Sequence, residues 1–266
     1  MSSAHGYFSA NSPPVRIVND VLASLGNRFL FSRGLAGDFL NHGESVQRLQ
    51  AEVKSVVRWG DGESLILQGG DIYFQPFSLE LRTRLLEIIK NYTEDGGYYL
   101  AVPTQYLTSS STRLRSTRRG TSNDFAIWRV SRFVYWKYFP RNKTYLDAFL
   151  FKGASEEQLK EVIKILAQFS TFVVVSSEAD NVATFFGKNL KDSFCTTIAI
   201  PAKNAFESYR DILKAVQKKL DECSGANQKE ILVLLSAGPC AKVLAYDLTC
   251  RGYTAFDVGK LFRCWT

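Results

Sequence analysis

The chain has 266 residues, of which 45% are hydrophobic and 22% are charged, and its formal net charge is +7. This length and composition fit one globular domain with a large core and exclude a fibrous or low-complexity chain. The positive charge favours anionic partners such as phosphates, nucleotides, nucleic acid or an acidic membrane face. Five scattered cysteines without CxxC spacing argue against a disulfide framework or a zinc site. Because no signal sequence or long apolar run is visible, we expect a cytoplasmic protein.

In chain order, the sequence predicts a disordered N-terminus over 1–13 and a single domain over 14–266. That domain opens with a helix over 14–26. Apolar strands and amphipathic helices then alternate. The strands are expected at 53–59, 98–103, 144–151, 171–177, 196–201, 231–238 and 254–259, and helices are expected to begin near Ser78, 125, Ser155, Asn204 and Pro239. This alternation predicts an α/β protein with a Rossmann-like, mostly parallel sheet and helices on both faces.

A loop rich in serine, threonine and arginine is predicted over 108–123. It contains Arg113, Arg115, Arg118 and Arg119. These side chains could close over phosphates, contact a membrane surface or nucleic acid, or simply be solvated. The sequence leaves these alternatives open.

The stretch "VVRWGDGE" places polar residues where a predicted strand ends. In parallel sheets, ligands bind beyond the carboxyl ends of the strands. Asp61 and Glu63, separated by one glycine, could converge on a divalent cation, which prefers oxygen ligands. Arg58 could make a bidentate contact with a phosphate. The alternative is a solvated turn in which both acids only cap the following helix.

Two further turns follow predicted strands. Lys203 and Asn204 lie in "PAKNAF", at the expected start of a helix, where an anion is favoured. Gly238 lies in "SAGPCAK", which matches neither the P-loop nor the GxGxxG pattern. The only histidines, His5 and His42, lie outside these turns, so a histidine-based catalytic or metal site is not expected.

Together, "VVRWGDGE", "IAIPAKNAFESYRDIL" and "LVLLSAGPCAKVLAYDLTCRGYTAFDVG" resemble the GT-D-fold glycosyltransferases over about residues 50–259. The resemblance implies a nucleotide-sugar donor, UDP-linked, and a Mn²⁺ or Mg²⁺ ion held by a DxE motif. Here that motif is Asp61 and Glu63. It also implies a donor site that includes Arg58, Gly60, Lys203, Asn204 and Gly238.

The chain departs from this family near its end. Cys240 replaces a usual threonine, Lys260 replaces a usual histidine, and Phe262 and Cys264 stand where the family tail is acidic. An acceptor hydroxyl needs a base within hydrogen-bond reach. The remaining candidates for catalysis are Asp257 and Lys260, the latter as a cation that stabilises the leaving diphosphate; Glu178 comes next.

The leading hypothesis is a metal-dependent glycosyltransferase acting on a glycan, glycoprotein or lipid-linked acceptor. The first alternative is an impaired homologue that binds a nucleotide-sugar or supports a partner enzyme. The second is a nucleic-acid or membrane-surface module, which would bind without metal and with strong salt dependence. The retained DxE motif favours the enzyme, and no nucleic-acid partner is expected.

Overall fold

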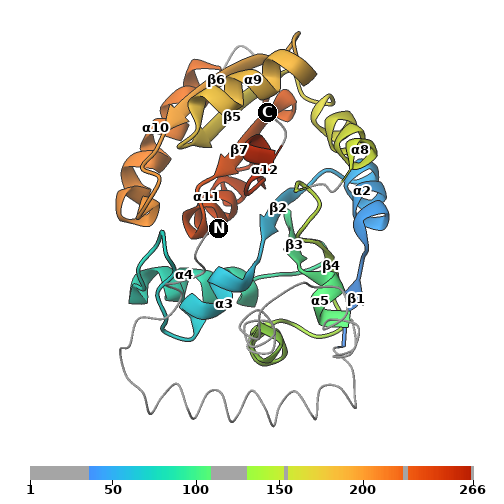
Figure 1. Ribbon diagram of the computed structural model, residues 1–266, viewed down its shortest axis with the longest axis vertical. Coiled ribbons are helices and arrows are strands. Elements are labelled where there is room, and N and C mark those ends of the chain that lie inside the picture. Colours follow the sequence, from blue (N-terminus) through green and yellow to red (C-terminus); the bar gives the residue numbers. More distant parts are fainter. Residues whose placement is uncertain (1–35, 109–130, 153–154, 224–226, 265–266) are drawn as a thin grey trace, which may run out of the picture.

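The computed structural model describes residues 36–108, 131–152, 155–223 and 227–264 (Figure 1). The predicted disorder over 1–13, the predicted helix over 14–26 and nearly all of the arginine-rich loop lie outside these residues. The described part forms an α/β structure around one sheet of eight strands, in the order β1-β4-β3-β2-β8-β7-β5-β6.

Every strand pairing in this sheet is parallel, which confirms the predicted fold class. The strands are β1 (Asp38–Phe39), β2 (Ser55–Arg58), β3 (Tyr98–Val102), β4 (Thr144–Asp147), β5 (Thr171–Ser176), β6 (Phe194–Ala199), β7 (Ile231–Ser236) and β8 (Thr254–Asp257). From β2 the chain builds outward through β3 and β4, then crosses to the other half of the sheet. Strand β8 joins the halves, with Val56 of β2 opposite Phe256.

Helices cover both faces of the sheet (Figure 1). One face packs against α4 (Leu79–Lys90), α10 (Tyr209–Glu222) and α11 (Pro239–Cys250), and the other packs against α2 (His42–Ala51), α8 (Glu156–Leu166), α9 (Ala179–Asn189) and α12 (Leu261–Cys264). Short helical elements α3 (Asp61–Leu67), α5 (Thr104–Thr108), η1 (Ala205–Ser208) and η2 (Gln228–Glu230) lie in the connections, and a further helix covers 131–138.

The apolar strands are explained by this two-sided burial. Successive strand residues point to opposite faces. Accordingly, Val57 and Leu235 belong to the core on the α11 side, whereas Val56 and Leu234 belong to the core on the α9 side. Both faces are buried, so the strands read as nearly continuous apolar runs.

Several predicted element boundaries are wrong for local reasons. The strand predicted over 144–151 ends at Asp147, whose carboxylate accepts a hydrogen bond from the Phe149 backbone N–H and starts a turn. Asn204 does not cap a helix with its side chain; its φ is 56°, and the 3₁₀ turn η1 intervenes before α10. Helix α2 and the short strand β1 were not predicted; α2 begins with a capping box of Asn41 and Glu44.

Within the described ranges, no helix has the length and apolar character needed to cross a membrane.

Replacing Phe256 with alanine should remove a large part of the central core. Phe256 is completely buried and packs against Phe151 and Phe169, with ring centroids 5.6 and 6.1 Å away. We expect Phe256→Ala to lower the free energy of unfolding by about 3–5 kcal/mol, measured by urea denaturation. Phe194 on the edge strand β6 is 60% exposed, so Phe194→Ala should cost no more than about 0.5 kcal/mol. Equal losses would contradict the assigned position of Phe256.

Candidate functional site

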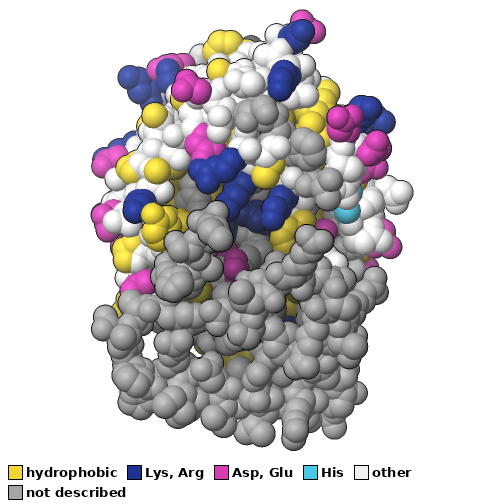
Figure 2. All heavy atoms as spheres, in the orientation of Figure 1, with side chains coloured by type: hydrophobic (Ala, Val, Ile, Leu, Met, Phe, Trp, Pro, Cys, Tyr) yellow, Lys and Arg dark blue, Asp and Glu magenta, His cyan; other side chains and the backbone are white. Residues whose placement is uncertain are grey.

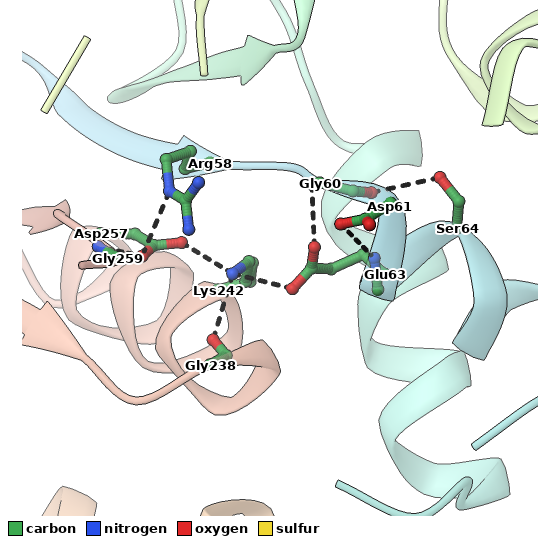
Figure 3. A network of polar contacts seen from close by, with 10 residues as sticks. Arg58, Gly60, Asp61, Glu63, Ser64, Gly238, Lys242, Asp257 and Gly259 are labelled. Carbon is green, nitrogen blue, oxygen red and sulfur yellow. Dashed lines mark hydrogen bonds and ion pairs between the residues drawn. The ribbon is translucent and has the colours of Figure 1, made fainter. Parts of the chain in front are cut away.

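The predicted site residues that follow β2 and β8 meet at the carboxyl edge of the sheet (Figure 3). Arg58 is the last residue of β2, Gly60 precedes α3, and Asp257 ends β8. Helix α11 enters from the Gly238 turn after β7. At this edge the chain leaves β2 toward α4 on one face of the sheet and leaves β8 toward α12 on the other, and ligands bind at such points of divergence in open α/β sheets.

Glu63 faces the protein interior. Its Oε2 accepts a hydrogen bond of 2.8 Å from the Gly60 N–H and so caps α3. The Ser64 hydroxyl donates to the Gly60 carbonyl at 3.2 Å and tightens the same turn. One of the two oxygens of Glu63 therefore caps the helix, as the alternative to metal binding predicted.

The other oxygen of Glu63 contacts a buried lysine. Lys242, in α11, has a side chain only 1% exposed, and its Nζ lies 2.8 Å from Glu63 Oε1 and 3.0 Å from Asp257 Oδ2. It also donates to the Gly238 carbonyl at 3.1 Å. A buried charge is tolerated only when it is paired and hydrogen-bonded. The ammonium therefore ties α3, β8 and the Gly238 turn together (Figure 3).

The surroundings shift the pKa of Glu63. Burial alone would raise this pKa, but the charge and hydrogen bond of Lys242 and the charge of Arg58 lower it, and the net shift is below the ordinary value. Glu63 is therefore a carboxylate at neutral pH.

Arg58 reaches across the end of β8. Its Nε lies 3.9 Å from Asp257 Oδ1, and its guanidinium packs against Gly259. Gly259 has a φ of 55°, and any Cβ there would collide with the guanidinium. Asp257 Oδ1 also accepts from the Gly259 N–H at 3.1 Å. Arg58 keeps 23% of its side chain exposed and can present its outer nitrogens to a ligand.

Asp61 is exposed, unlike Glu63. One of its oxygens accepts from the Gly62 N–H at 3.1 Å. Tyr135, on the helix over 131–138, lies near both acids. Burial, followed by the charges of Glu63 and Asp61, raises the pKa of Tyr135 well above its usual range, so the phenol stays protonated.

These residues fit a divalent ion mainly through Asp61. Its exposed carboxylate is a hard oxygen ligand at the edge where diphosphates are expected. Glu63 already has Lys242 on one oxygen and Gly60 on the other. No group of three or more histidine, cysteine, aspartate or glutamate side chains that could hold a metal occurs among the residues described. That Asp61 and Glu63 hold one ion together stays a prediction.

The turn from Pro201 to Asn204 lies beside the same edge but on another loop. The Asn204 N–H donates to the Phe74 carbonyl at 2.8 Å, and Phe74 packs against Gly238. Lys203 is exposed and lies over the ring of Tyr73, with Nζ 4.5 Å from the ring centroid. Two sequence-predicted segments, at Lys203 and at Gly238, are therefore bridged by residues 73–74.

The altered C-terminal segment divides into core and surface positions. Phe262 is completely buried and packs against Phe185, with ring centroids 5.5 Å apart, so it faces the core. Lys260 and Cys264 are exposed. Arg263 forms an ion pair with Glu178, the acid considered next as a base. Asp257 is also an unfavourable base, because its side chain is only 1% exposed and faces Lys242 and Arg58.

Sequence reasoning missed Lys242 and Tyr135. A signal for Lys242 is present, since it is the only charged residue in the otherwise apolar run "PCAKVLAY" of α11. Such a lysine must be paired if the helix is buried. Tyr135 carried no comparable signal, because an aromatic helix normally supplies core residues.

The described residues thus form a parallel α/β sheet whose carboxyl edge carries a cluster of paired charges. The family described as the glycosyltransferase GT-D fold matches residues 56–263. The chain therefore belongs to this family of glycosyltransferases.

Curated relatives carry the same class of name. The chain is 25% identical over 277 residues to a probable glycosyl transferase, Gly, of Streptococcus gordonii, covering 98% of this chain and 37% of that protein. It is 25% identical over 231 residues to the glycosyltransferase GlyD of Streptococcus pneumoniae serotype 4, covering 82% of this chain and 26% of that protein. The chain thus spans about a third or less of these relatives.

Solved structures share the fold. A glycosyltransferase of Streptococcus sanguinis containing domain of unknown function 1792 superposes with a TM-score of 0.68 at 23% identity, covering 86% of this chain and 83% of that one. A second structure, described as this domain with a distinct glycosyltransferase fold, gives a TM-score of 0.66 at 21% identity, covering 94% and 84%.

Removing the ammonium of Lys242 should destabilise the fold. Lys242→Met leaves Glu63 and Asp257 buried without their shared cation, so we expect the free energy of unfolding to fall by about 3–5 kcal/mol in urea denaturation at pH 7. Lys214 is exposed on α10, and Lys214→Met should change it by no more than about 0.5 kcal/mol. A loss below about 1 kcal/mol for Lys242→Met would show that the ion pairs do not stabilise the fold.

The contribution of Glu63 should depend on pH. Its folded-state pKa lies below the ordinary value of 4.5, so its stabilising effect is present above that pH and is lost as the pH falls further. Glu63→Gln should therefore cost about 1.5–3 kcal/mol at pH 7, and the difference from the parent should shrink as the pH is lowered from 7 to below 4.5. Urea unfolding across this range measures the gap. A gap that is constant with pH would contradict the proposed charge state.

Proposed function

We propose that the chain is a metal-dependent glycosyltransferase that acts in the cytoplasm. It would move a sugar from a UDP-linked donor to a glycan, a glycoprotein or a lipid-linked acceptor. The family match supports sugar transfer, and one observation supports the location of the donor site: Arg58, Gly60 and Asp61 line the carboxyl edge of the sheet around the buried pair of Lys242 and Glu63.

The donor diphosphate would lie along this edge. The partly exposed guanidinium of Arg58, fixed by Gly259 and Asp257, can bind a phosphate in two-pronged geometry. Gly60 presents backbone without a side chain over this edge, whereas the face of Gly238 is covered by the Phe74 ring. Lys260, exposed just after the Gly259 turn, adds a second cation for the leaving diphosphate.

Asp61 would be the main protein ligand of a Mn²⁺ or Mg²⁺ ion. When bound, such an ion neutralises charge that develops on a leaving diphosphate. Glu63 would support Asp61 indirectly, because its contacts with Gly60 and Lys242 fix the first turn of α3. Asp257 would likewise position Arg58 and Lys242 from its buried place.

The alternative is a homologue that binds a nucleotide-sugar but transfers it slowly, or that supports a partner enzyme. Two contacts favour it: Phe262 is committed to the core, and Arg263 is paired with Glu178, so the altered segment offers no free carboxylate within residues 257–264. Both hypotheses share the donor site. A transfer assay with a panel of acceptors separates them, since the enzyme turns over many times on its acceptor, whereas the alternative predicts donor binding with little or no transfer.

Changing Asp61 should weaken metal-dependent donor binding without changing the fold. Asp61 is exposed, so we expect Asp61→Asn to leave the melting temperature within about 1 °C of the parent. Its dissociation constant for UDP with Mn²⁺ should rise about tenfold, or about 1.4 kcal/mol, by calorimetry. Glu80→Gln, an exposed change at the start of α4, is the matched control. Unchanged affinity in Asp61→Asn would exclude Asp61 as the metal ligand.

A further inference from the structure

The loop between α3 and α4 forms a tight turn midway along its length. Ile72 and Gln75 form an isolated antiparallel bridge, with backbone hydrogen bonds of 3.0 and 3.1 Å between them. The Asp71 carboxylate accepts from the Phe77 N–H at 2.7 Å and closes the base of the loop. Tyr73 and Phe74 therefore occupy the tip of the turn.

This tip is fixed against the turn that contains Lys203. The Asn204 N–H donates to the Phe74 carbonyl at 2.8 Å, and the Phe206 N–H donates to Gln75 Oε1 at 3.1 Å. Gln75 is only 2% exposed, so its amide is committed to this contact. Figure 1 shows the loop between α3 and α4 rising beside the start of α10. The turn is held from two sides and is preorganised.

Phe74 also places the tip beside the charged crevice. Its ring packs so closely on Gly238 that a Cβ there would lie 2.8 Å from a ring carbon, and the Gly238 φ of 57° also disfavours other residues. The Gly238 carbonyl accepts from Lys242. Figure 2 shows lysine and arginine side chains gathered in the middle of this face, with hydrophobic side chains beside them. The tip therefore borders the proposed donor site.

Tyr73 keeps a large aromatic surface open to solvent. It is 71% exposed, and Phe74 is 38% exposed. The ammonium of Lys203 lies 4.5 Å from the Tyr73 ring centroid, and no carboxylate pairs with it within the described ranges. A lone exposed aromatic residue has little meaning. On a turn held by hydrogen bonds, this exposed ring and the ammonium over it offer an aromatic surface for a base and a positive charge for a phosphate, next to the proposed donor site.

We propose that Tyr73 stacks on the base of the nucleotide donor and that Lys203 contacts the adjoining phosphate. This inference rests on the proposed function and adds the subsite that recognises the base. Aromatic rings stack on every type of nucleobase, and an ammonium group held over such a ring attracts a negatively charged ligand. A neutral acceptor sugar could pack on the Tyr73 ring but would not interact with the charge of Lys203. A nucleotide can bind both groups and is therefore the favoured ligand.

Calorimetry with two probes tests the subsite. The purified chain is titrated with UDP and with inorganic pyrophosphate, both with Mn²⁺. Tyr73→Ala should weaken UDP binding about tenfold and leave pyrophosphate binding unchanged, because only UDP has a base. Tyr73→Phe keeps the ring and should stay within about twofold of the parent. Lys203→Ala should weaken both probes, because both carry phosphate.

Leu79→Ala is the matched control, since Leu79 is a large apolar residue that is 67% exposed outside this turn. Melting temperatures near that of the parent show that the variants fold. Unchanged UDP affinity in Tyr73→Ala, or an equal loss for UDP and pyrophosphate, overturns the inference. In those cases parental UDP binding leaves the proposed function standing, whereas a parent that binds neither UDP nor another nucleoside diphosphate overturns both.

Discussion

The placement of one ammonium group between two buried carboxylates governs the architecture of the crevice. Lys242 contacts Glu63 at the start of α3 and Asp257 at the end of β8, and it also binds the Gly238 carbonyl after β7. None of these charges could remain buried alone, because the desolvation cost of each is met only by its partners. These ion pairs therefore hold the three chain segments together, and the edge that carries Arg58 and Asp61 is built on them.

The same network gives two neighbouring acids different tasks. Glu63 is turned inward and is neutralised by lysine, whereas Asp61 remains in solvent one glycine away. The sequence spacing alone suggests two equivalent ligands, yet the helix start separates them. Arg58 shows the complementary case, since it is anchored by Asp257 and Gly259 but keeps part of its guanidinium accessible. The buried charges of Glu63 and Asp257 thus fix the positions of the more exposed charges of Asp61 and Arg58.

Local pattern predicted the parallel sheet and the strand ends that carry Arg58, Asp61 and Asp257, because burial on both faces leaves a clear apolar signature. It could not predict the partner of Glu63, since Lys242 lies far along the chain and only the sheet order brings them together. Asn204 was expected to cap a helix, but its left-handed backbone and its bond to Phe74 give it another role. Tyr73 escaped notice for the same reason: its surroundings come from two distant turns.

The central position of the last strand has a consequence for how the chain folds. The Ala255 N–H of β8 donates to the Ser55 hydroxyl of β2, a contact that spans 200 residues. Until β8 is synthesised, β1–β4 and β5–β7 are separate half-sheets, and β2 and β7 each expose an unpaired edge. Such long-range pairing slows folding, and open edges invite association with other chains. Closing of the sheet, and with it of the crevice, therefore depends on a strand from the end of the described chain.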